Sequence, residues 1–424
     1  MLRRLDLRGL ADPAADLPRP VIDGDEPVAA VREIIADVRH RGDTALLELT
    51  ARFDGPIDAV RVDPAEVKAA LEGIDPTLRR ALEVAAERIA RFHEAQLRPP
   101  HEVADDGVTV RCWDQPLRRA GCYVPGGRAT YPSTVLMSAV VARVAGVEEV
   151  VLAVPPGRDG RVPRATLAAA AVAGVDEVYA VGGAQAIAAL AYGTETVGAC
   201  DVICGPGNIY VAIAKREVAA DVRVAAAFAG PSEVVVVADS TAPPAAAAVD
   251  VIVQAEHGPD GLAWLVAWDE DAAMAIDAEI DRLVAEAPRA DDIRATLSEG
   301  GYVALVDGPA AAATVVDRIA PEHLEVMTSD PADVVDRVRN AGAIFVGASS
   351  PASIGDYVAG PSHVLPTNAT ARFGAALSTD DFRKAMHVVE VSDEGLAELG
   401  PHVAAIAEAE GLAAHALSVR LPRR

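Results

Sequence analysis

Residues 177–218 read EVYAVGGAQAIAALAYGTETVGACDVICGPGNIYVAIAKREV, and this stretch decides the fold class. Apolar extended runs at 177–181 and 201–204 are each followed by a Gly-rich turn and then by a helical pattern, at 184–191 and 209–218. Short apolar runs that alternate with helices are typical of βαβ units, which build a parallel sheet. The stretch therefore predicts part of an open α/β sheet.

The same alternation continues on both sides and falls into two series, one that starts at Gly121 and one that follows Ala242. The predicted strands are 149–154, 177–181, 201–204, 233–238, 262–268, 302–306, 325–328 and 343–346. The predicted helices are 133–145, 164–173, 184–191, 209–218, 272–287, 310–319 and 332–340. Because parallel sheets are covered on both faces, we expect an α/β fold with two parallel-type sheets flanked by helices.

The two ends of the chain differ from this middle part. Residues 1–20 show no clear period, and helical patterns follow at 26–53 and 63–97. Residues 108–113 predict a short strand or a hairpin edge. From Asp380 onward the pattern is helical and more polar, which predicts a separate small helical tail.

The charge of the chain restricts its partners. The formal net charge of the 424 residues is -25. Nucleic acid and anionic membrane surfaces both require a basic face, so this charge argues against either as a partner. No apolar run approaches the ~20 residues of a membrane helix, and the first residues lack the apolar core of a signal peptide. We therefore expect a cytoplasmic protein.

Four Gly-rich turns fall where a strand gives way to a helix, the position at which open α/β sheets bind ligands. They lie at 121–127, 182–185, 205–210 and 229–233, and they carry Tyr123, Gln185, Asn208 and Ser232. The turn at 205–210 opens a helix, a context that suits an anion. Tyr210, however, stands where a dinucleotide fingerprint has its third Gly. A nucleotide site and ordinary turn chemistry both remain open from these turns alone.

Half of a possible metal site lies at the end of a predicted helix, in residues 253–260, which read VQAEHGPD. Gln254 and His257 are three residues apart, so they share one face of that helix. Spacing and residue type favour Glu256 over Gln254 as a ligand beside His257, because carboxylates are commoner metal ligands than amides.

Further acids and histidines lie beside Gly, Pro or each other in three later segments. These are Glu322-His323, Asp356 with His363, and Glu410 with His415. Asp356 and His415 are good zinc ligands by type. Glu322 and His323 are candidates for acid–base chemistry, because His titrates near neutrality and Glu can deprotonate water. A single such His is more often a surface or capping residue, and the sequence does not show that these segments converge.

Taken together, these motifs closely resemble the histidinol dehydrogenase family. The resemblance covers nearly the whole chain and is weakest over about the first hundred residues. The blocks that carry it are 121–127 with 133–137, 181–190, 205–215, 229–233, 254–260, 320–325, 341–367, 371–384 and 410–420.

The resemblance implies an activity and its cofactors. Enzymes of this family oxidise L-histidinol to L-histidine with two NAD, through bound L-histidinal, as the last step of histidine biosynthesis. They are homodimers that hold one zinc ion in each subunit. The expected partners are therefore L-histidinol, NAD and a second copy of the chain.

The resemblance also implies a role for each candidate residue. It gives Gln254, His257, Asp356 and His415 as zinc ligands, so it moves the prediction from Glu256 to Gln254. It gives Glu322 and His323 as the catalytic acid–base pair. The implied substrate-binding residues are Ser232, Gln254, His257, His323, Asp356, His363, Glu410 and His415. The implied NAD contacts are Tyr123, Gln185 and Asn208.

The architecture that the resemblance implies is a pair of incomplete Rossmann-like domains with two appendages. The expected division is an N-terminal arm at 1–19, an outer domain at 20–122 and 234–377 that carries most of the zinc and substrate site, an inserted domain at 123–233 on the NAD side, and a helical tail at 378–424. The arm and the tail would reach across the dimer, so His415 and Glu410 would serve the partner's site.

Three positions depart from the family's usual residues: Ala226 stands in place of Asp, Ala352 in place of Glu, and Cys204 in place of an aliphatic residue. None of them is a predicted ligand or catalytic residue. Ala226 lies nearest the predicted substrate contact Ser232, so its effect would fall on local packing there.

Two alternative functions stay open. The first is a related zinc- and NAD-dependent dehydrogenase of another small polar alcohol, and the presence of Ser232, His363 and Glu410 favours histidinol over it. The second is a metal-dependent hydrolase that uses Glu322 on a metal-bound water. The Gly-rich turns that carry the predicted NAD contacts argue against the hydrolase.

Overall fold

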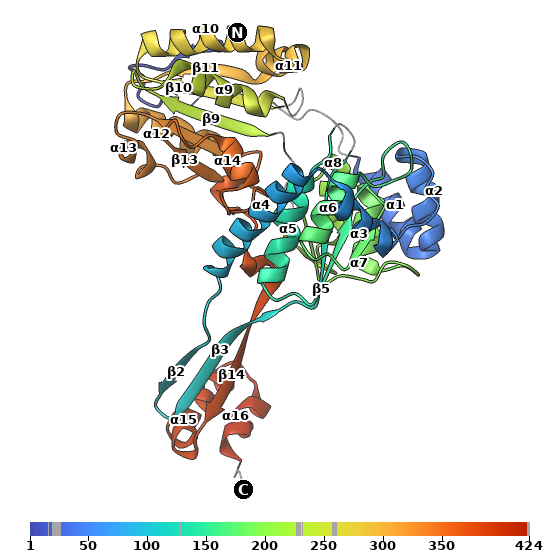
Figure 1. Ribbon diagram of the computed structural model, residues 1–424. Helices are drawn as coiled ribbons and strands as arrows, with labels where there is room; N and C mark the ends of the chain where they lie inside the picture. Colours follow the sequence, from blue (N-terminus) through green and yellow to red (C-terminus); the bar gives the residue numbers. More distant parts are fainter. Residues whose placement is uncertain are drawn as a thin grey trace.

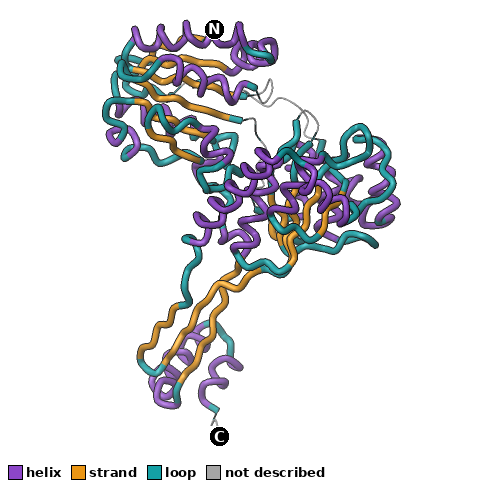
Figure 2. The backbone as a smooth tube through the Cα atoms, viewed as in Figure 1, coloured by secondary structure: helices purple, strands orange, loops and turns teal. Residues whose placement is uncertain are grey.

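The computed structural model describes residues 1–15, 17–18, 27–126, 129–225, 230, 232–256 and 261–421. Within these residues the chain forms two parallel sheets covered by helices and a projecting antiparallel arm (Figure 1). Figure 2 shows the strands of each parallel sheet enclosed between helices. The predicted α/β class with two parallel-type sheets is confirmed.

The first parallel sheet has six strands in the order β1-β11-β10-β9-β12-β13. Its strands are β1 (Arg3–Asp6), β9 (Glu233–Ala238), β10 (Leu262–Ala267), β11 (Gly301–Leu305), β12 (His323–Met327) and β13 (Ala343–Val346). On one face lie α9 (Pro244–Ala255), α10 (Glu270–Glu286) and α11 (Ala290–Gly300), and on the other α12 (Pro309–Ile319) and α13 (Ala332–Val335). The Val run of β9 alternates between these two cores, which explains why it is apolar throughout.

The second parallel sheet has five strands in the order β6-β5-β4-β7-β8. Its strands are β4 (Arg119–Tyr123), β5 (Glu149–Ala153), β6 (Glu177–Tyr179), β7 (Val202–Cys204) and β8 (Arg223–Val224). Helices α5 (Pro132–Val144) and α6 (Arg164–Val172) pack on one face, and α7 (Gly183–Tyr192) and α8 (Ile209–Val218) on the other. The stretch 177–218 therefore forms the βαβα unit that the sequence predicts.

Four N-terminal helices pack outside the second sheet. They are α1 (Val28–Arg41), α2 (Asp43–Phe53), α3 (Pro64–Gly73) and α4 (Pro76–Glu94). Val31 and Leu46 share a core with α7 and α8, whereas Leu82 and Ile89 share one with α5 and α6. The sequence assigns residues 20–122 to the outer domain, and that division into domains stays a prediction. The packing of these four helices differs from the assignment. The apolar faces of residues 28–94 pack against helices α5 to α8, which cover the sheet of the predicted insert.

An antiparallel arm projects from the body of the molecule (Figure 1). It consists of β14 (Arg383–Val391), β3 (Val108–Pro116) and β2 (His101–Asp105), with α15 (Asp393–Ala409) and α16 (Ala413–Arg420) beside them. The predicted helical tail is right for α15 and α16 but wrong for residues 383–391. These residues form a strand because β3 offers a complete ladder, in which Val389 lies opposite Val110.

The remaining elements complete the description. Residues 3–6, for which the sequence shows no period, form β1 at the edge of the first sheet, in register with β11 of the same chain. Helix α13 ends at Val335, earlier than predicted. Helix α14 (Ala352–Tyr357) and two short 3-10 helices (Thr370–Arg372 and Thr379–Phe382) follow β13. Across the described ranges, none of the helices is long and apolar enough to span a membrane.

Candidate active site

Three side chains that are far apart in the sequence meet at the amino ends of β9 and β12. Gln254 Nε2 lies 3.2 Å from His323 Nδ1, and His323 Nε2 lies 3.0 Å from Asp356 Oδ1. Gln254 comes from the last turn of α9, His323 is the first residue of β12, and Asp356 lies on α14. Gln254 and His323 are buried and Asp356 is partly exposed. These three candidates therefore belong to one cluster.

The position of this cluster differs from the sequence-based expectation. Ligand sites were expected at the carboxyl ends of strands, whereas His323 begins its strand. In a parallel α/β sheet the carboxyl ends of the helices lie at the amino ends of the strands. Helix α9, which connects β9 to β10, brings its carboxyl end beside His323 at the start of β12. The carboxyl end of a helix carries a partial negative charge, which favours a cation. Backbone electrostatics at this end therefore suits a metal ion rather than an anion.

Glu322 stands beside His323 with its side chain held by the backbone. Its Oε2 accepts a hydrogen bond of 3.1 Å from the Glu233 backbone N–H and lies 3.6 Å from His323 Nδ1. Burial alone lowers the pKa of His323, but the carboxylates of Glu322 and Asp356 outweigh it and raise that pKa to about 10. The two carboxylates therefore stabilise the imidazolium that forms when His323 accepts a proton.

His363 connects the cluster to α5, a helix that covers the second sheet. Its Nδ1 lies 2.8 Å from the Asp356 backbone oxygen, and its Nε2 lies 3.1 Å from Thr134 Oγ1 at the start of α5. Burial lowers the pKa of His363. Ser362 next to it donates to the Met137 backbone oxygen at 3.0 Å. The loop after α14 thus ties the cluster to the first turns of α5.

Three of the predicted Gly-rich turns converge at the carboxyl ends of the second sheet. The Tyr123 hydroxyl accepts a hydrogen bond of 3.2 Å from the Gly183 backbone N–H, and burial raises the pKa of Tyr123 to about 12. Gly205 has φ 103°, and a Cβ there would collide with the Tyr123 backbone oxygen. Glycine at 205 therefore lets two turns touch.

Gln185 belongs to the turn at 182–185 and Asn208 to the turn at 205–210. Asn208 is exposed and caps α8 by accepting a hydrogen bond of 3.2 Å from the Val211 backbone N–H. Gln185 is buried on α7, and its Nε2 has no partner among the described residues. The N-termini of α7 and α8 thus lie side by side with polar side chains at their ends.

Lys215 is a residue of this region that the sequence reasoning missed. It is buried on α8, and its Nζ donates to the Gly205 backbone oxygen. Burial lowers its pKa to about 8. The signal that could have identified it is a lysine within an otherwise apolar helix face, between Ala214 and Val218.

The remaining predicted site residues are His415, Glu410, Ser232 and His257. His415 lies on α16 and Glu410 at the end of α15, both exposed on the tail that continues the arm. Ser232 is partly buried just before β9. His257, like the departure Ala226, lies outside the described residues. Within the described part of the chain, no group of three or more His, Cys, Asp and Glu side chains could hold a metal ion.

The other two departures fit their surroundings. Ala352 is buried at the start of α14, and its backbone N–H donates to Glu325 Oε1 at 3.0 Å. Cys204 is buried on β7, with its Sγ 3.7 Å from that of Cys122 on β4. Both are core positions.

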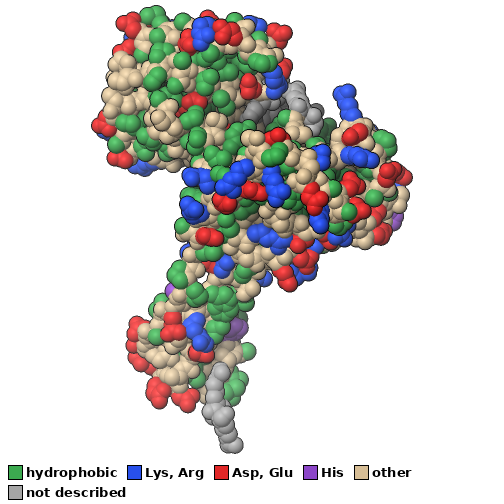
Figure 3. Space-filling model, viewed as in Figure 1, with side chains coloured by type: hydrophobic (Ala, Val, Ile, Leu, Met, Phe, Trp, Pro, Cys, Tyr) green, Lys and Arg blue, Asp and Glu red, His purple; other side chains and the backbone are tan. Residues whose placement is uncertain are grey.

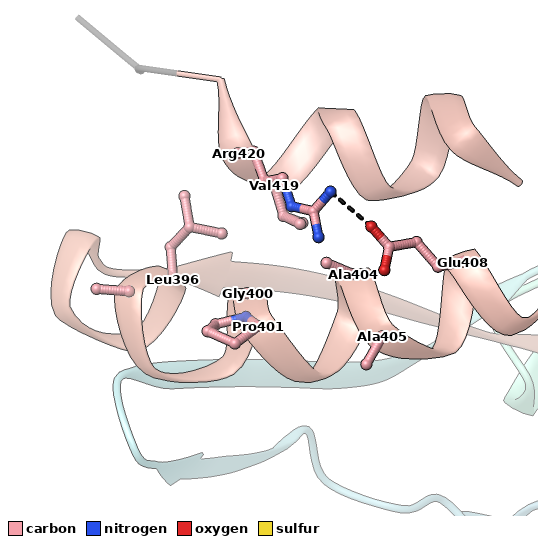
Figure 4. Close-up of a pocket in the computed structure, with 9 residues that line it drawn as sticks. Leu396, Gly400, Pro401, Ala404, Ala405, Glu408, Val419 and Arg420 are labelled. Carbon is pink, nitrogen blue, oxygen red and sulfur yellow. Dashed lines mark ion pairs between the residues drawn. The ribbon is translucent and has the colours of Figure 1, made fainter.

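A hollow of about 380 Å³ lies in the tail. It lies between α15 and α16, is lined by small and apolar side chains such as Ala404 and Leu396, and is crossed by an Arg420–Glu408 ion pair of 2.7 Å (Figure 4). No candidate catalytic residue lines it.

Gly-rich turns at the carboxyl ends of one parallel sheet and a buried acid–histidine cluster at the amino ends of the other define an α/β oxidoreductase of the nucleotide-dependent dehydrogenase class. The family model described as histidinol dehydrogenase matches residues 17–423. The chain belongs to the histidinol dehydrogenase family and is accordingly an NAD-dependent oxidoreductase of histidine biosynthesis.

Individual relatives agree with this assignment. The chain is 47% identical over 433 residues to histidinol dehydrogenase of Thermobifida fusca, a match that covers 100% of this chain and 98% of that one. It is 46% identical over 399 residues to the Geobacillus kaustophilus enzyme of the same name, with 94% of each chain covered. A crystal structure of histidinol dehydrogenase from Elizabethkingia anophelis superposes with a TM-score of 0.94 at 33% identity, over 99% of this chain and 97% of that one.

Proposed function

We propose that this chain catalyses the zinc-dependent, four-electron oxidation of L-histidinol to L-histidine through bound L-histidinal, with two NAD, as the last step of histidine biosynthesis. The single observation that carries the proposal is the meeting of Gln254, His323 and Asp356 at the carboxyl end of α9. The His363–Thr134 contact joins this cluster to α5, a helix that covers the sheet with the Gly-rich turns.

The residues present fit a zinc ion. Gln254 Oε1 is buried and lacks a hydrogen-bond partner in the part of the chain that the structure describes, so its lone pairs are available to a metal. Asp356 supplies a carboxylate to the same cluster. We expect Gln254, His257, Asp356 and His415 from a second copy to be the ligands. Zinc bound there would hold the amine and imidazole nitrogens of the substrate and fix its reacting carbon.

His323 and Glu322 divide the proton chemistry in the proposed scheme. His323 takes the hydroxyl proton of L-histidinol while hydride leaves the carbon for NAD, which gives L-histidinal. Glu322 then removes a proton from water as the water oxygen adds to the aldehyde carbon. A second hydride transfer from the resulting hydrate gives L-histidine. Because both residues are buried, an aldehyde held against them would be shielded from bulk water between the two steps.

The turns that carry Tyr123, Gln185 and Asn208 are the proposed NAD site. The N-termini of α7 and α8 lie in these turns, and the partial positive charge of a helix N-terminus favours the pyrophosphate of a dinucleotide. The buried Gln185 Nε2 supplies a donor that no described residue uses. The same turns weigh against a hydrolase, which needs no dinucleotide.

A second copy of this chain is the proposed partner of the arm. The arm and tail expose large apolar side chains, and Figure 3 shows hydrophobic side chains gathered on the visible face of the arm. The exposed large apolar side chains of the arm and tail include Val103, Met386, Val388, Val389, Val391, Val403, Ile406, Leu412, Leu417 and Leu421. Surfaces of this kind mark an interface. A homodimer would cover them and bring His415 and Glu410 to the cluster of the other chain.

Mixed dimers test the sharing of the site. Glu322→Gln and His415→Asn dimers should each be nearly inactive. Subunit exchange between them should restore activity, because one site in each mixed dimer then has every group intact. Absence of recovery, with exchange verified by differently tagged subunits, would mean that the tail serves its own chain.

The experiment that tests the proposed function uses metal-stripped protein with L-histidinol and NAD. NADH absorbance should appear only after zinc is added back. Turnover of another amino alcohol in preference to L-histidinol would support the related dehydrogenase instead, and zinc-dependent hydrolysis without NADH would support the hydrolase. The cytoplasmic location expected from the sequence stays a prediction.

A further inference from the structure

Behind the cluster lie two buried carboxyl groups that the proposed mechanism does not use. Asp250 on α9 is 2% exposed and Glu325 on β12 is 1% exposed. Their carboxyl groups lie within hydrogen-bonding reach of each other. Buried acids of this kind are rare unless they are paired.

The pair requires one proton between its two members. Asp250 Oδ1 and Glu325 Oε2 are fully buried, and no other donor among the described residues reaches them. Two ionised carboxylates have only acceptors, so a hydrogen bond between them requires one to be protonated. Burial raises the pKa of both groups, that of Glu325 to about 10.

Asp250 and Glu325 lie on the same helix and strand as the cluster residues Gln254 and His323. Asp250 lies one helical turn before Gln254 on α9, and Glu325 lies two residues after His323 on the same face of β12. The other Glu325 oxygen, Oε1, accepts 3.0 Å from the backbone N–H of Ala352, the first residue of α14. One hydrogen-bonded unit therefore joins the three elements that carry Gln254, His323 and Asp356.

We propose that the Asp250–Glu325 pair, with its single shared proton, is a positioning unit that fixes α9, β12 and α14 relative to one another and so sets the spacing of Gln254, His323 and Asp356. This inference rests on the proposed function, because it assigns those three residues to one working site. Asp250 and Glu325 are positioning residues: they act through the residues on their own elements and contact no reacting atom.

The shared proton makes a specific prediction about amide variants. In Glu325→Gln the amide N–H₂ donates to the Asp250 carboxylate while its oxygen still accepts from the Ala352 N–H. In Asp250→Asn the amide donates to the Glu325 carboxylate. Either variant should keep kcat within about threefold of wild type, because the amide N–H takes the place of the shared carboxyl proton as the donor between the two side chains.

Apolar replacements of Asp250 or Glu325 should disturb the spacing of Gln254, His323 and Asp356. Glu325→Met leaves the Asp250 carboxyl group and the Ala352 N–H unpaired. We expect kcat to fall on the order of 100-fold, the effect of a misplacement of about 1 Å, and zinc to bind at least about 10-fold more weakly. KM for L-histidinol should rise while KM for NAD stays the same, because the proposed NAD site lies on the other sheet. Asp250→Leu should behave in the same way.

Asp239→Leu is the matched control. Asp239 is a buried carboxyl group just after the opposite end of β9, where it accepts from Thr241 and Ser329. Its replacement should lower the melting temperature of the zinc enzyme without changing KM for L-histidinol or the bound zinc.

The outcomes separate the possible failures. Unchanged kcat, KM and bound zinc in folded Glu325→Met would overturn the positioning role. Equal damage from Glu325→Gln and Glu325→Met would overturn the shared proton and indicate that both carboxylates are needed in ionised form. Inactive wild type with L-histidinol and NAD would refute the proposed function, and the zinc affinities of the same variants would still decide the inference.

Discussion

Replacing Gln254 by Ala should weaken zinc binding far more than replacing Glu256 by Ala. Gln254 is 1% exposed, and its Oε1 lacks a hydrogen-bond partner in the described ranges, as expected of an atom that coordinates a metal ion. Glu256 follows the last residue of α9 and is exposed. The two residues are separated by one position, so the pair is a matched comparison.

The size of the effect follows from the number of ligands. Structural zinc sites with four ligands in small domains bind with roughly 10–16 kcal/mol, so one ligand in four corresponds to about 3 kcal/mol. That is on the order of 100-fold or more in Kd. Gln254→Ala also removes the contact of 3.2 Å with His323, which orients the ring. An exposed carboxylate contributes about 1 kcal/mol at most, so Glu256→Ala should change Kd by less than about fivefold.

Zinc affinity can be measured by competition with a chromogenic chelator, and bound zinc by atomic absorption after dialysis. Gln254→Glu should retain zinc, because it keeps an oxygen ligand in the same place. Equal losses in Gln254→Ala and Glu256→Ala, or a larger loss in Glu256→Ala, would refute the reasoning and return the ligand to the residue that spacing favours.

Other substitutions give sharp outcomes as well. Glu322→Gln should slow the oxidation of L-histidinal by about 10²–10⁴-fold and that of L-histidinol much less, and equal loss in single-turnover assays of the two halves would contradict its role. Asn208→Ala should cost about 1 kcal/mol of stability through the lost cap and raise KM for NAD alone, so a rise in KM for L-histidinol would contradict the placement of NAD. Burial lowers the pKa of Lys215 from 10.5 to about 8, so the unfolded chain binds this proton more tightly and the folded chain bears a cost of about 3 kcal/mol below pH 8. That cost should disappear as pH rises from 8 to 10.5. In denaturant titrations the free energy of unfolding of wild type should therefore rise over this range relative to that of Lys215→Met. The same pH dependence in both proteins would contradict the burial effect.

Both parallel sheets could be predicted from the sequence because their central strands are buried on both faces. A run such as Val234–Val237 is apolar at every position and is followed by a clear helical pattern. Strands β1 and β14 could not be predicted in the same way. Most of their residues are exposed, and each is a strand because of a partner far away in the chain, β11 or β3. Local periodicity contains no information about such pairing.

The site was predictable by residue type but not by arrangement. The sequence indicates Glu322, His323 and Asp356 as chemically suitable, yet their meeting with Gln254 depends on how α9 and α14 pack against β12. Residue type alone prefers Glu256 as a ligand, whereas burial distinguishes Gln254 from it. The location at the amino ends of strands, where α9 ends, also follows from the fold rather than from the motif.

The number of NADH formed for each L-histidinol consumed decides most directly whether one site performs both oxidations. With limiting L-histidinol, excess NAD and added zinc, we predict two NADH for each L-histidinol, L-histidine as the product and little free L-histidinal. One NADH for each L-histidinol, with L-histidinal accumulating in solution, would contradict a four-electron oxidation at this site.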